Sequence, residues 1–268
     1  MKIITLMEDT YGNNNCEYEH GLSLYIETQK HHILFDTGAS SKILDNAKAL
    51  KIDLTKVDIV VLSHGHYDHA GGILAFSQLN PQATIYMQSH VDGEYYHGDK
   101  YIGINKEIMN LPQIRILNGD FKIDDELLIY SHIKGRRLFA KSNLELSKRI
   151  GHTVIPDIFD HEQCLVIFQE NKKLLLSGCA HNGILNILDR YYEIFNEYPH
   201  MVISGFHMSK KIEYTNQEIT DIKNIAEELN QMDTVFYTGH CTGLKAYHIM
   251  KNIMKNKLIY IHSGDRIV

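Results

Sequence analysis

Apolar residues along this 268-residue chain gather in short runs, mostly β-branched, that are separated by polar or glycine-containing turns. Apolar runs of roughly four to eight residues between turn signals are typical of strands buried in a sheet. We therefore predict strands at residues 3–6, 22–26, 33–35, 58–62, 85–87, 127–130, 164–168, 173–176, 201–204, 235–238 and 258–261. Longer segments with helical periodicity predict helices at residues 41–50, 184–195, 216–229 and 244–254.

The order of these elements indicates an α/β fold. Strands come first and are then mixed with helices in both halves of the chain, which favours pairing between strands that are neighbours in sequence. Two mixed sheets packed on each other, with helices outside, fit this order. No linker divides residues 1–268, so we expect a single domain. The region from about residue 90 to 144 is rich in Gly, Asn, Tyr and basic residues, and we predict a substrate-side insertion there.

Composition narrows the class of protein. The hydrophobic fraction of 44% is sufficient for a sizeable core, and no apolar run is long enough to cross a membrane. Acids and amides near the N-terminus replace the apolar core of a signal peptide, so we expect a cytoplasmic protein. A net charge of -6 argues against a nucleic-acid partner. The cysteines are widely spaced and predict buried thiols, and the 16 tyrosines are compatible with a homodimer.

The strongest chemical signal is the segment SHGHYDHAGG at residues 63–72, directly after a predicted buried strand. In extended chain, residues two apart point to the same side, so His64 and His66 can share one ion. Asp68 and His69 then turn the other way and can hold a second ion. Neutral imidazoles and a carboxylate suit zinc, iron or manganese. The segment therefore predicts a dinuclear metal site.

The HxHxDH pattern is the signature of the metallo-β-lactamase superfamily, which this chain resembles well beyond the motif itself. The segments HGLSLYIET, LSHGHYDHAGG, GCAHNGILNIL, SGFHM and GHCTG resemble the branch related to 7,8-dihydropterin-6-methyl-4-(β-D-ribofuranosyl)-aminobenzene-5′-phosphate synthase. The resemblance covers nearly the whole chain and is weakest in the middle. It implies an αββα sandwich and two divalent ions, zinc first, with iron or manganese as alternatives.

The resemblance also implies ligands outside the motif. Asp36, in LFDTG, would orient the metal loop, although an Asp there could instead cap a helix or a turn. Where the superfamily has a bridging Asp, this chain has Cys179, followed by His181. We predict that His181 is the third ligand beside His64 and His66. Cys179 is then a neighbour or weak ligand, or simply a small buried residue.

A late histidine completes the predicted second position. His240, in TGHCTG, would bind with Asp68 and His69. His152 follows a glycine as the superfamily's upstream histidine does, but it precedes an irregular segment, so we do not assign it as a ligand. His207, in SGFHM, is predicted to line the pocket as a proton donor, with a purely structural role as the alternative. We predict Asp68 and His207 as the catalytic residues.

These features favour an enzyme that acts on a small molecule. Our first expectation is a hydrolase that uses metal-activated water on a phosphate, ester or lactone. The branch resemblance implies an alternative, a metal-assisted condensation that releases pyrophosphate, and iron in a redox or sensory protein is a third. A phosphorylated substrate needs nearby cations. Lys134, Arg136, Arg137 and Lys141 are candidates, although such clusters usually form a solvated face.

Overall fold

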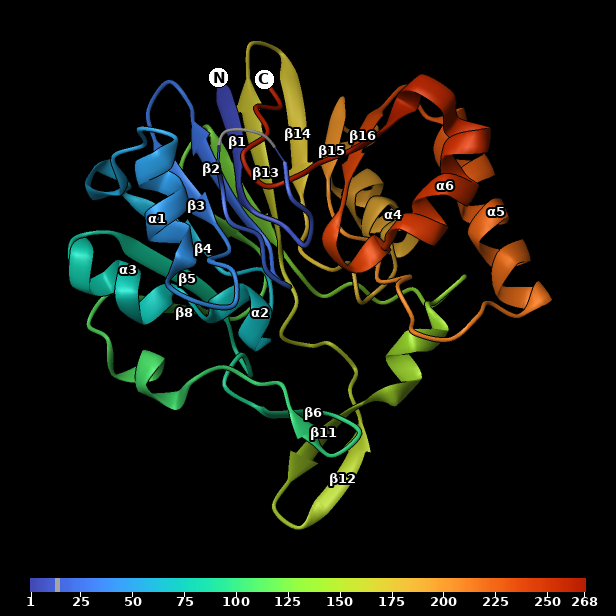
Figure 1. The fold of residues 1–268 in the computed structure, drawn as a ribbon, viewed down its shortest axis with the longest axis horizontal. Coiled ribbons are helices and arrows are strands. Elements are labelled where there is room, and N and C mark those ends of the chain that lie inside the picture. The colour runs from blue at the N-terminus through green and yellow to red at the C-terminus, as the bar shows by residue number, and fades with distance from the viewer. Residues whose placement is uncertain (13–14) are drawn as a thin grey trace.

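The computed structural model describes residues 1–12 and 15–268, and it has two sheets packed face to face with helices on both outer faces (Figure 1). The first sheet has six strands in the order β1-β2-β3-β4-β5-β8. Its strands are β1 (Lys2–Met7), β2 (Ser23–Glu27), β3 (His32–Phe35), β4 (Ile59–Val61), β5 (Thr84–Gln88) and β8 (Ile114–Leu117). Pairing is antiparallel from β1 to β3 and parallel from β3 to β8.

The second sheet has seven strands in the order β17-β16-β15-β14-β13-β10-β9. Its strands are β9 (Phe121–Lys122), β10 (Leu127–Tyr130), β13 (Cys164–Gln169), β14 (Lys172–Leu176), β15 (Met201–Ile203), β16 (Val235–Thr238) and β17 (Leu258–Tyr260). Pairing is antiparallel from β9 to β14 and parallel from β14 to β17. Most neighbours in both sheets follow each other in sequence, as the order of elements predicts.

Helices cover the outer face of each sheet (Figure 1). The outer helices are α1 (Lys42–Ala49) and α3 (Ile73–Leu79) on the first sheet, and α4 (Ile184–Phe195), α5 (Asn216–Gln231) and α6 (Leu244–Met254) on the second. The predicted boundaries of α4, β16 and α6 are confirmed. Helix α5 begins at a capping box, in which the Thr215 hydroxyl and the Glu218 carboxylate bond each other's backbone N–H groups.

Three apolar layers explain why the strands read as continuous hydrophobic runs. In β3, Ile33 and Phe35 face the layer between the sheets, whereas Leu34 faces α1 and α3. In β14, Leu174 and Leu176 face the same central layer, and Leu175 faces α4 to α6. Successive side chains of a strand point to opposite faces, so a strand covered on both sides needs apolar residues at every position.

A small third sheet lies beside the sandwich and corrects the predicted insertion. Its order is β12-β11-β6-β7, from β6 (Glu94–His97), β7 (Lys100–Tyr101), β11 (Leu146–Ile150) and β12 (Thr153–Pro156). Residues 114–130, placed inside the insertion by their irregular composition, instead supply β8, β9 and β10 to the main sheets. The additional structure therefore comes from two separate segments. No helix in the described part of the chain is long and apolar enough to span a bilayer.

Short 3₁₀ helices connect several strands, and two of them, at residues 141–145 and 240–242, lie beside the predicted site. They are η1 (Leu54–Lys56), η2 (Lys106–Asn110), η3 (Lys141–Glu145), η4 (His240–Thr242) and η5 (Lys255–Lys257). The carboxyl ends of β3, β4, β14, β15 and β16 meet at one edge of the sandwich, because these strands run parallel within each sheet. Ligands bind preferentially at such an edge.

Candidate metal centre

The HxHxDH segment leaves β4 as extended chain and then turns into the short helix α2 (Tyr67–Ala70). His66 precedes α2 with extended φ and ψ of -106° and 149°, and its ring centroid lies 4.6 Å from that of His64. Asp68 and His69 lie within the helical turn and are directed toward His240. The backbone therefore divides the motif into two parts, as its spacing predicts.

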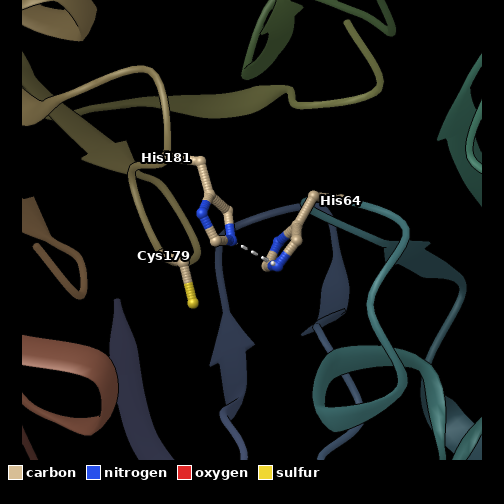
Figure 2. Close-up of side chains that lie close together, drawn as sticks. All are labelled: His64, Cys179 and His181. Carbon is tan, nitrogen blue, oxygen red and sulfur yellow. Dashed lines mark hydrogen bonds between the residues drawn. The ribbon is translucent and has the colours of Figure 1, made fainter. Parts of the chain in front are cut away.

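His64 and His181 bring their Nε2 atoms to within 3.3 Å of each other (Figure 2). Asn143 donates its side-chain N–H to the His181 carbonyl, so Asn143 Oδ1 accepts from His181 Nδ1 at 3.0 Å. Ser63 donates its hydroxyl to Asp36, so the Ser63 oxygen accepts from His64 Nδ1 at 2.8 Å. This hydrogen-bond network assigns the proton of each ring to Nδ1 and leaves a lone pair on Nε2.

His69 and His240 form a second pair with the same arrangement. Their Nε2 atoms lie 3.2 Å apart. His69 Nδ1 donates to Asp36 at 2.7 Å, and His240 Nδ1 donates to Asp9 at 2.6 Å. Asp68 Oδ2 lies 3.4 Å from His240 Nε2 and 3.8 Å from His69 Nε2. The predicted set of Asp68, His69 and His240 is therefore brought together.

The two pairs fit divalent cations. Lone pairs that face each other across 3.2–3.3 Å repel unless a cation lies between them. Histidines that ligate metals almost always donate their other N–H group to a carboxylate or carbonyl oxygen, as three of these four rings do, and the fourth, His64, donates to a hydroxyl. Burial lowers the pKa of His64 and His181 well below the ordinary value, which keeps both rings neutral as ligands must be.

The second pair also carries negative charge that attracts a cation. Burial raises the pKa of the Asp68 carboxyl, but His69 and His240 outweigh this effect and hold it well below its usual range. Burial lowers the pKa of His240, but Asp9 and Asp68 outweigh it and raise this pKa well above the ordinary value. The position therefore favours a positive charge, whether it is a proton or a metal ion.

Cys179 lies between the two pairs. Its Sγ is 3.2 Å from His69 Nε2. Ligand atoms of His64, Cys179 and His181 lie within 4.8 Å of one another, and the same holds for His69, Cys179 and His240. Figure 2 shows the thiol directed to one side of the His64 and His181 rings. Burial raises the pKa of the Cys179 thiol well above its ordinary value. Its position is that of a candidate bridging ligand.

His66 lies against the first pair and also faces Asp157. Its ring centroid lies 4.8 Å from that of His181, so the rings of the predicted set are in contact. However, His66 Nε2 is buried without a hydrogen-bond partner in the described part of the chain, 4.0 Å from Asp157 Oδ2. Burial lowers the pKa of His66 to about 3. His66 thus forms a wall beside the first pair with Asp157, and its unpaired Nε2 keeps it a candidate ligand, as its place in the motif predicts.

His161 extends this wall but is not placed to bind a metal. Its Nδ1 accepts from the backbone N–H of Gly65 at 2.9 Å, so the proton of the neutral ring lies on Nε2, 3.2 Å from Asp157. A neutral imidazole with both nitrogens engaged in this way has no lone pair for an ion. Tyr95 packs on the same ring, with centroids 4.1 Å apart. We infer that His161 fixes the backbone of the motif.

Asp36 lies where the sequence predicts, directly after β3. Its φ of 58° is left-handed, and the buried carboxylate accepts from the Ser63 backbone N–H, the Ser63 hydroxyl and His69. It thereby supports one ring of each pair. His207 packs on His181, with ring centroids 4.1 Å apart, and its Nδ1 is buried without a hydrogen-bond partner in the described residues. His152 is exposed in the turn between β11 and β12, away from this cluster.

Several supporting residues were not found by sequence analysis. Asp9 contacts His240 across 231 positions, and Asn143 contacts His181 from a region with no regular pattern. Buried Glu162 accepts from the backbone N–H groups of His181 and Asn182. The exposed His20 lies beside the second pair, with Nδ1 2.8 Å from Asp9 and Nε2 3.3 Å from Asp68. These contacts arise from tertiary pairing, and no local motif signals them.

The candidate cations have different roles. Arg137 pairs with Asp189 and Glu228, and Arg136 donates to backbone carbonyls, so both arginines are engaged within the fold. Lys134 is exposed. Lys141 lines a small cavity of about 50 Å³ between η3 and α5. The other lining residues are Phe139, Ala140, Ser142, Met208, Lys210, Tyr214, Glu218, Asp221, Ile222 and Ile225.

Comparison with known proteins agrees with this architecture. The model of the metallo-beta-lactamase superfamily matches residues 18–212. A 7,8-dihydropterin-6-methyl-4-(beta-D-ribofuranosyl)-aminobenzene-5'-phosphate synthase of Methanocaldococcus jannaschii is 29% identical, over 100% of this chain and 96% of its own length. An uncharacterised protein of the same organism is 28% identical over 99% of both chains.

Solved structures give the same result. The crystal structure of Tm1679, a metal-dependent hydrolase of the beta-lactamase superfamily, superposes with a TM-score of 0.85 at 29% identity, and covers 100% of this chain and 98% of that one. A metallo-beta-lactamase fold protein from Bacillus subtilis superposes with a TM-score of 0.55 at 13% identity, which shows the fold alone.

Proposed function

This chain belongs to the metallo-beta-lactamase superfamily, and on that premise we propose that it is a metal-dependent hydrolase of a small, anionic molecule. The observation that carries the proposal is the convergence of four Nε2 atoms in two pairs, 3.3 Å and 3.2 Å apart, with each Nδ1 engaged elsewhere. His64 and His181 would hold one ion, and His69, His240 and Asp68 the other. Zinc suits this donor set best, and iron or manganese would also be accepted.

Bound divalent ions would supply an acidified water and a Lewis acid for a carbonyl or phosphoryl oxygen. The residues around them determine orientation and proton movement. Asp36 fixes the His69 ring, and through Ser63 it also fixes His64. Asp68 Oδ2 is in contact with His20 and His240, so it is placed to accept a proton and pass it to the exposed His20.

The surroundings of the centre support a substrate with an anionic group. The cavity beside η3 is lined by Lys141, Lys210, Glu218 and Asp221 together with apolar side chains. It adjoins the centre through Ser142, whose hydroxyl donates to the His207 carbonyl at 2.7 Å. A phosphate or carboxylate would meet Lys141 there, because Glu218 already pairs with Lys210 at 2.7 Å. The metallo-beta-lactamase-type hydrolase Tm1679 supports hydrolysis as the reaction.

A second candidate is a condensation that releases pyrophosphate. It is favoured by the full-length match to the Methanocaldococcus jannaschii synthase, whose product joins a dihydropterin to a ribofuranosyl-aminobenzene phosphate. The same ions would then hold the leaving pyrophosphate. Both reactions depend on the same histidine pairs.

The test compares the metal-free and zinc-loaded protein on a chromogenic phosphodiester and a lactone. We expect zinc-dependent turnover that His64→Ala abolishes and that His152→Ala, a histidine in an exposed turn, leaves intact. Pyrophosphate release from a dihydropterin methyl diphosphate in the presence of the ribofuranosyl-aminobenzene phosphate, without ester hydrolysis, would support the second candidate. Equal activity of His64→Ala and His152→Ala in both assays would refute the role of this centre.

A further inference from the structure

Two thiols and a histidine lie together beside the histidine pairs. Ligand atoms of Cys179, His207 and Cys241 are within 4.8 Å of one another. They follow β14, β15 and β16, which are adjacent parallel strands, and Gly205 N–H donates to the Gly178 carbonyl at 2.8 Å to keep two of the loops together. Parallel pairing therefore places the three side chains next to one another at one edge of the sheet. The proposed function assigns no role to these three residues, although Cys179 also lies between the histidine pairs.

The donor atoms of this group are held in place and buried. Cys179 and Cys241 are 2% and 6% exposed. The backbone N–H of His207 donates to Cys241 Sγ at 3.3 Å, and its carbonyl accepts from the Ser142 hydroxyl. His207 has a left-handed φ of 49°, a conformation that costs energy for a residue with a side chain. These contacts fix the His207 backbone on both sides.

His207 supplies the observation that points to a ligand. Its Nδ1 is buried and has no hydrogen-bond partner among the described residues. A buried, unpaired imidazole nitrogen is costly, and a bound cation would remove that cost. The two thiol groups beside it are good donors to soft metal ions and poor hydrogen-bond partners for a ring nitrogen.

We propose that Cys179, His207 and Cys241 form a further metal position with thiolate-rich ligands. It goes beyond the proposed function and rests on it in one respect, because Cys179 is shared with the histidine pairs. Two cysteines and one histidine are a known ligand set for zinc with an open fourth coordination site. His207 is then a ligand and not the proton donor that the sequence predicts. Thiolates distinguish this position from the nitrogen and oxygen donors of the histidine pairs.

Binding at this position releases a proton from each thiol and exchanges S–H bonds for metal–sulfur bonds. A thiolate can bridge two ions, so an ion here would be coupled to its neighbours through Cys179. The position would therefore extend the dinuclear centre along the edge of the second sheet.

The experiment measures bound zinc by elemental analysis and the sulfur-to-metal charge-transfer absorption of the cobalt-substituted protein. The variants are Cys241→Ala and His207→Gln, with Cys164→Ala as the control because that buried thiol lies in β13, outside the centre. We expect Cys241→Ala and His207→Gln each to bind about one zinc equivalent less than Cys164→Ala. We also expect the near-ultraviolet cobalt absorption of Cys241→Ala to fall by about half, from two thiolates to one.

Equal zinc content and equal cobalt absorption in Cys241→Ala and Cys164→Ala would overturn the inference. The inference would also fail if alkylation found two fewer free thiols in the parent protein than its sequence contains, its mass were 2 Da lower and no ion were bound at this position. The two cysteines would then form a disulfide. Either result leaves the proposed function intact if His64→Ala still loses zinc and activity. Conversely, thiolate-dependent zinc that persists when His64→Ala retains full activity would support this position and refute the proposed function.

Discussion

Asp36→Asn should weaken both histidine pairs, although Asp36 lies behind them. The carboxylate accepts three hydrogen bonds of 2.7 Å, from the Ser63 backbone N–H, the Ser63 hydroxyl and His69 Nδ1. Asparagine offers one accepting oxygen and one donating amide group. If its oxygen keeps the backbone N–H of Ser63, its amide group faces the Ser63 hydroxyl and the His69 N–H, both of which are donors.

The network can relieve this conflict in one way. The Ser63 oxygen accepts from the amide and donates to His64, and His69 moves its proton to Nε2. Both rings then lose the lone pair that faces the centre. Removing the partner that orients a metal-ligating histidine typically lowers metal affinity by about 10- to 100-fold, which is about 1.4–2.7 kcal/mol at each position. We expect a loss of this size for both ions.

The assay is competition for zinc with a chromophoric chelator, which gives a dissociation constant for each ion. The matched control is Asp58→Asn, because Asp58 also accepts from a backbone N–H and contacts a histidine, but at the surface beside His31. Zinc affinities of Asp36→Asn within about twofold of those of Asp58→Asn would refute the assignment of the ring protons. The account also requires that both variants keep the secondary structure of the parent.

Three other changes test separate parts of the centre. Asp9→Asn removes the hydrogen-bond acceptor of His240 Nδ1. Zinc competition should therefore show about a tenfold loss of affinity for the second ion and little change for the first. Equal losses of affinity for both ions would contradict this expectation. Chelation should lower the thermal midpoint, since zinc at 100 times its dissociation constant adds about 2.7 kcal/mol to the free energy of unfolding; an unchanged midpoint would mean that no ion stabilises the fold. Burial lowers the pKa of His66 to about 3, so in the metal-free protein this ring stays neutral while the unfolded chain binds a proton below pH about 6.5. The contribution of His66 to stability is therefore lost as the pH falls from about 6.5 to about 3. In denaturant titrations over this range, His66→Gln should reduce the slope of the unfolding free energy against pH by about 1.4 kcal/mol per pH unit. An unchanged slope would refute this expectation.

The sequence predicted the elements that local pattern determines. Runs such as residues 33–35 and 174–176 are apolar at every position because both faces of the strand are covered. The division of HxHxDH into two parts follows from extended chain that enters a helical turn, so spacing alone predicts it. His181 and His240 were identified because each follows a predicted strand that ends in a glycine-containing turn.

Other features depend on contacts that no local pattern encodes. Asp9 and Asn143 support their histidines through contacts between distant segments, and neither lies in a recognisable motif. The strand at residues 127–130 was predicted, but β8 and β9 were not, and the place of residues 114–130 in the two main sheets follows from pairing with β5 and β13. The group of Cys179, His207 and Cys241 depends on the order of three parallel strands, which the sequence does not state directly.

The most direct test of the centre is an anomalous difference map at the zinc absorption edge, from crystals grown with excess zinc. We expect one peak between the Nε2 atoms of His64 and His181 and another between those of His69 and His240, each about 2.0–2.1 Å from its nitrogen ligands. Peaks at surface histidines alone, with none at these two pairs, would contradict the claim that the converging nitrogen atoms bind metal.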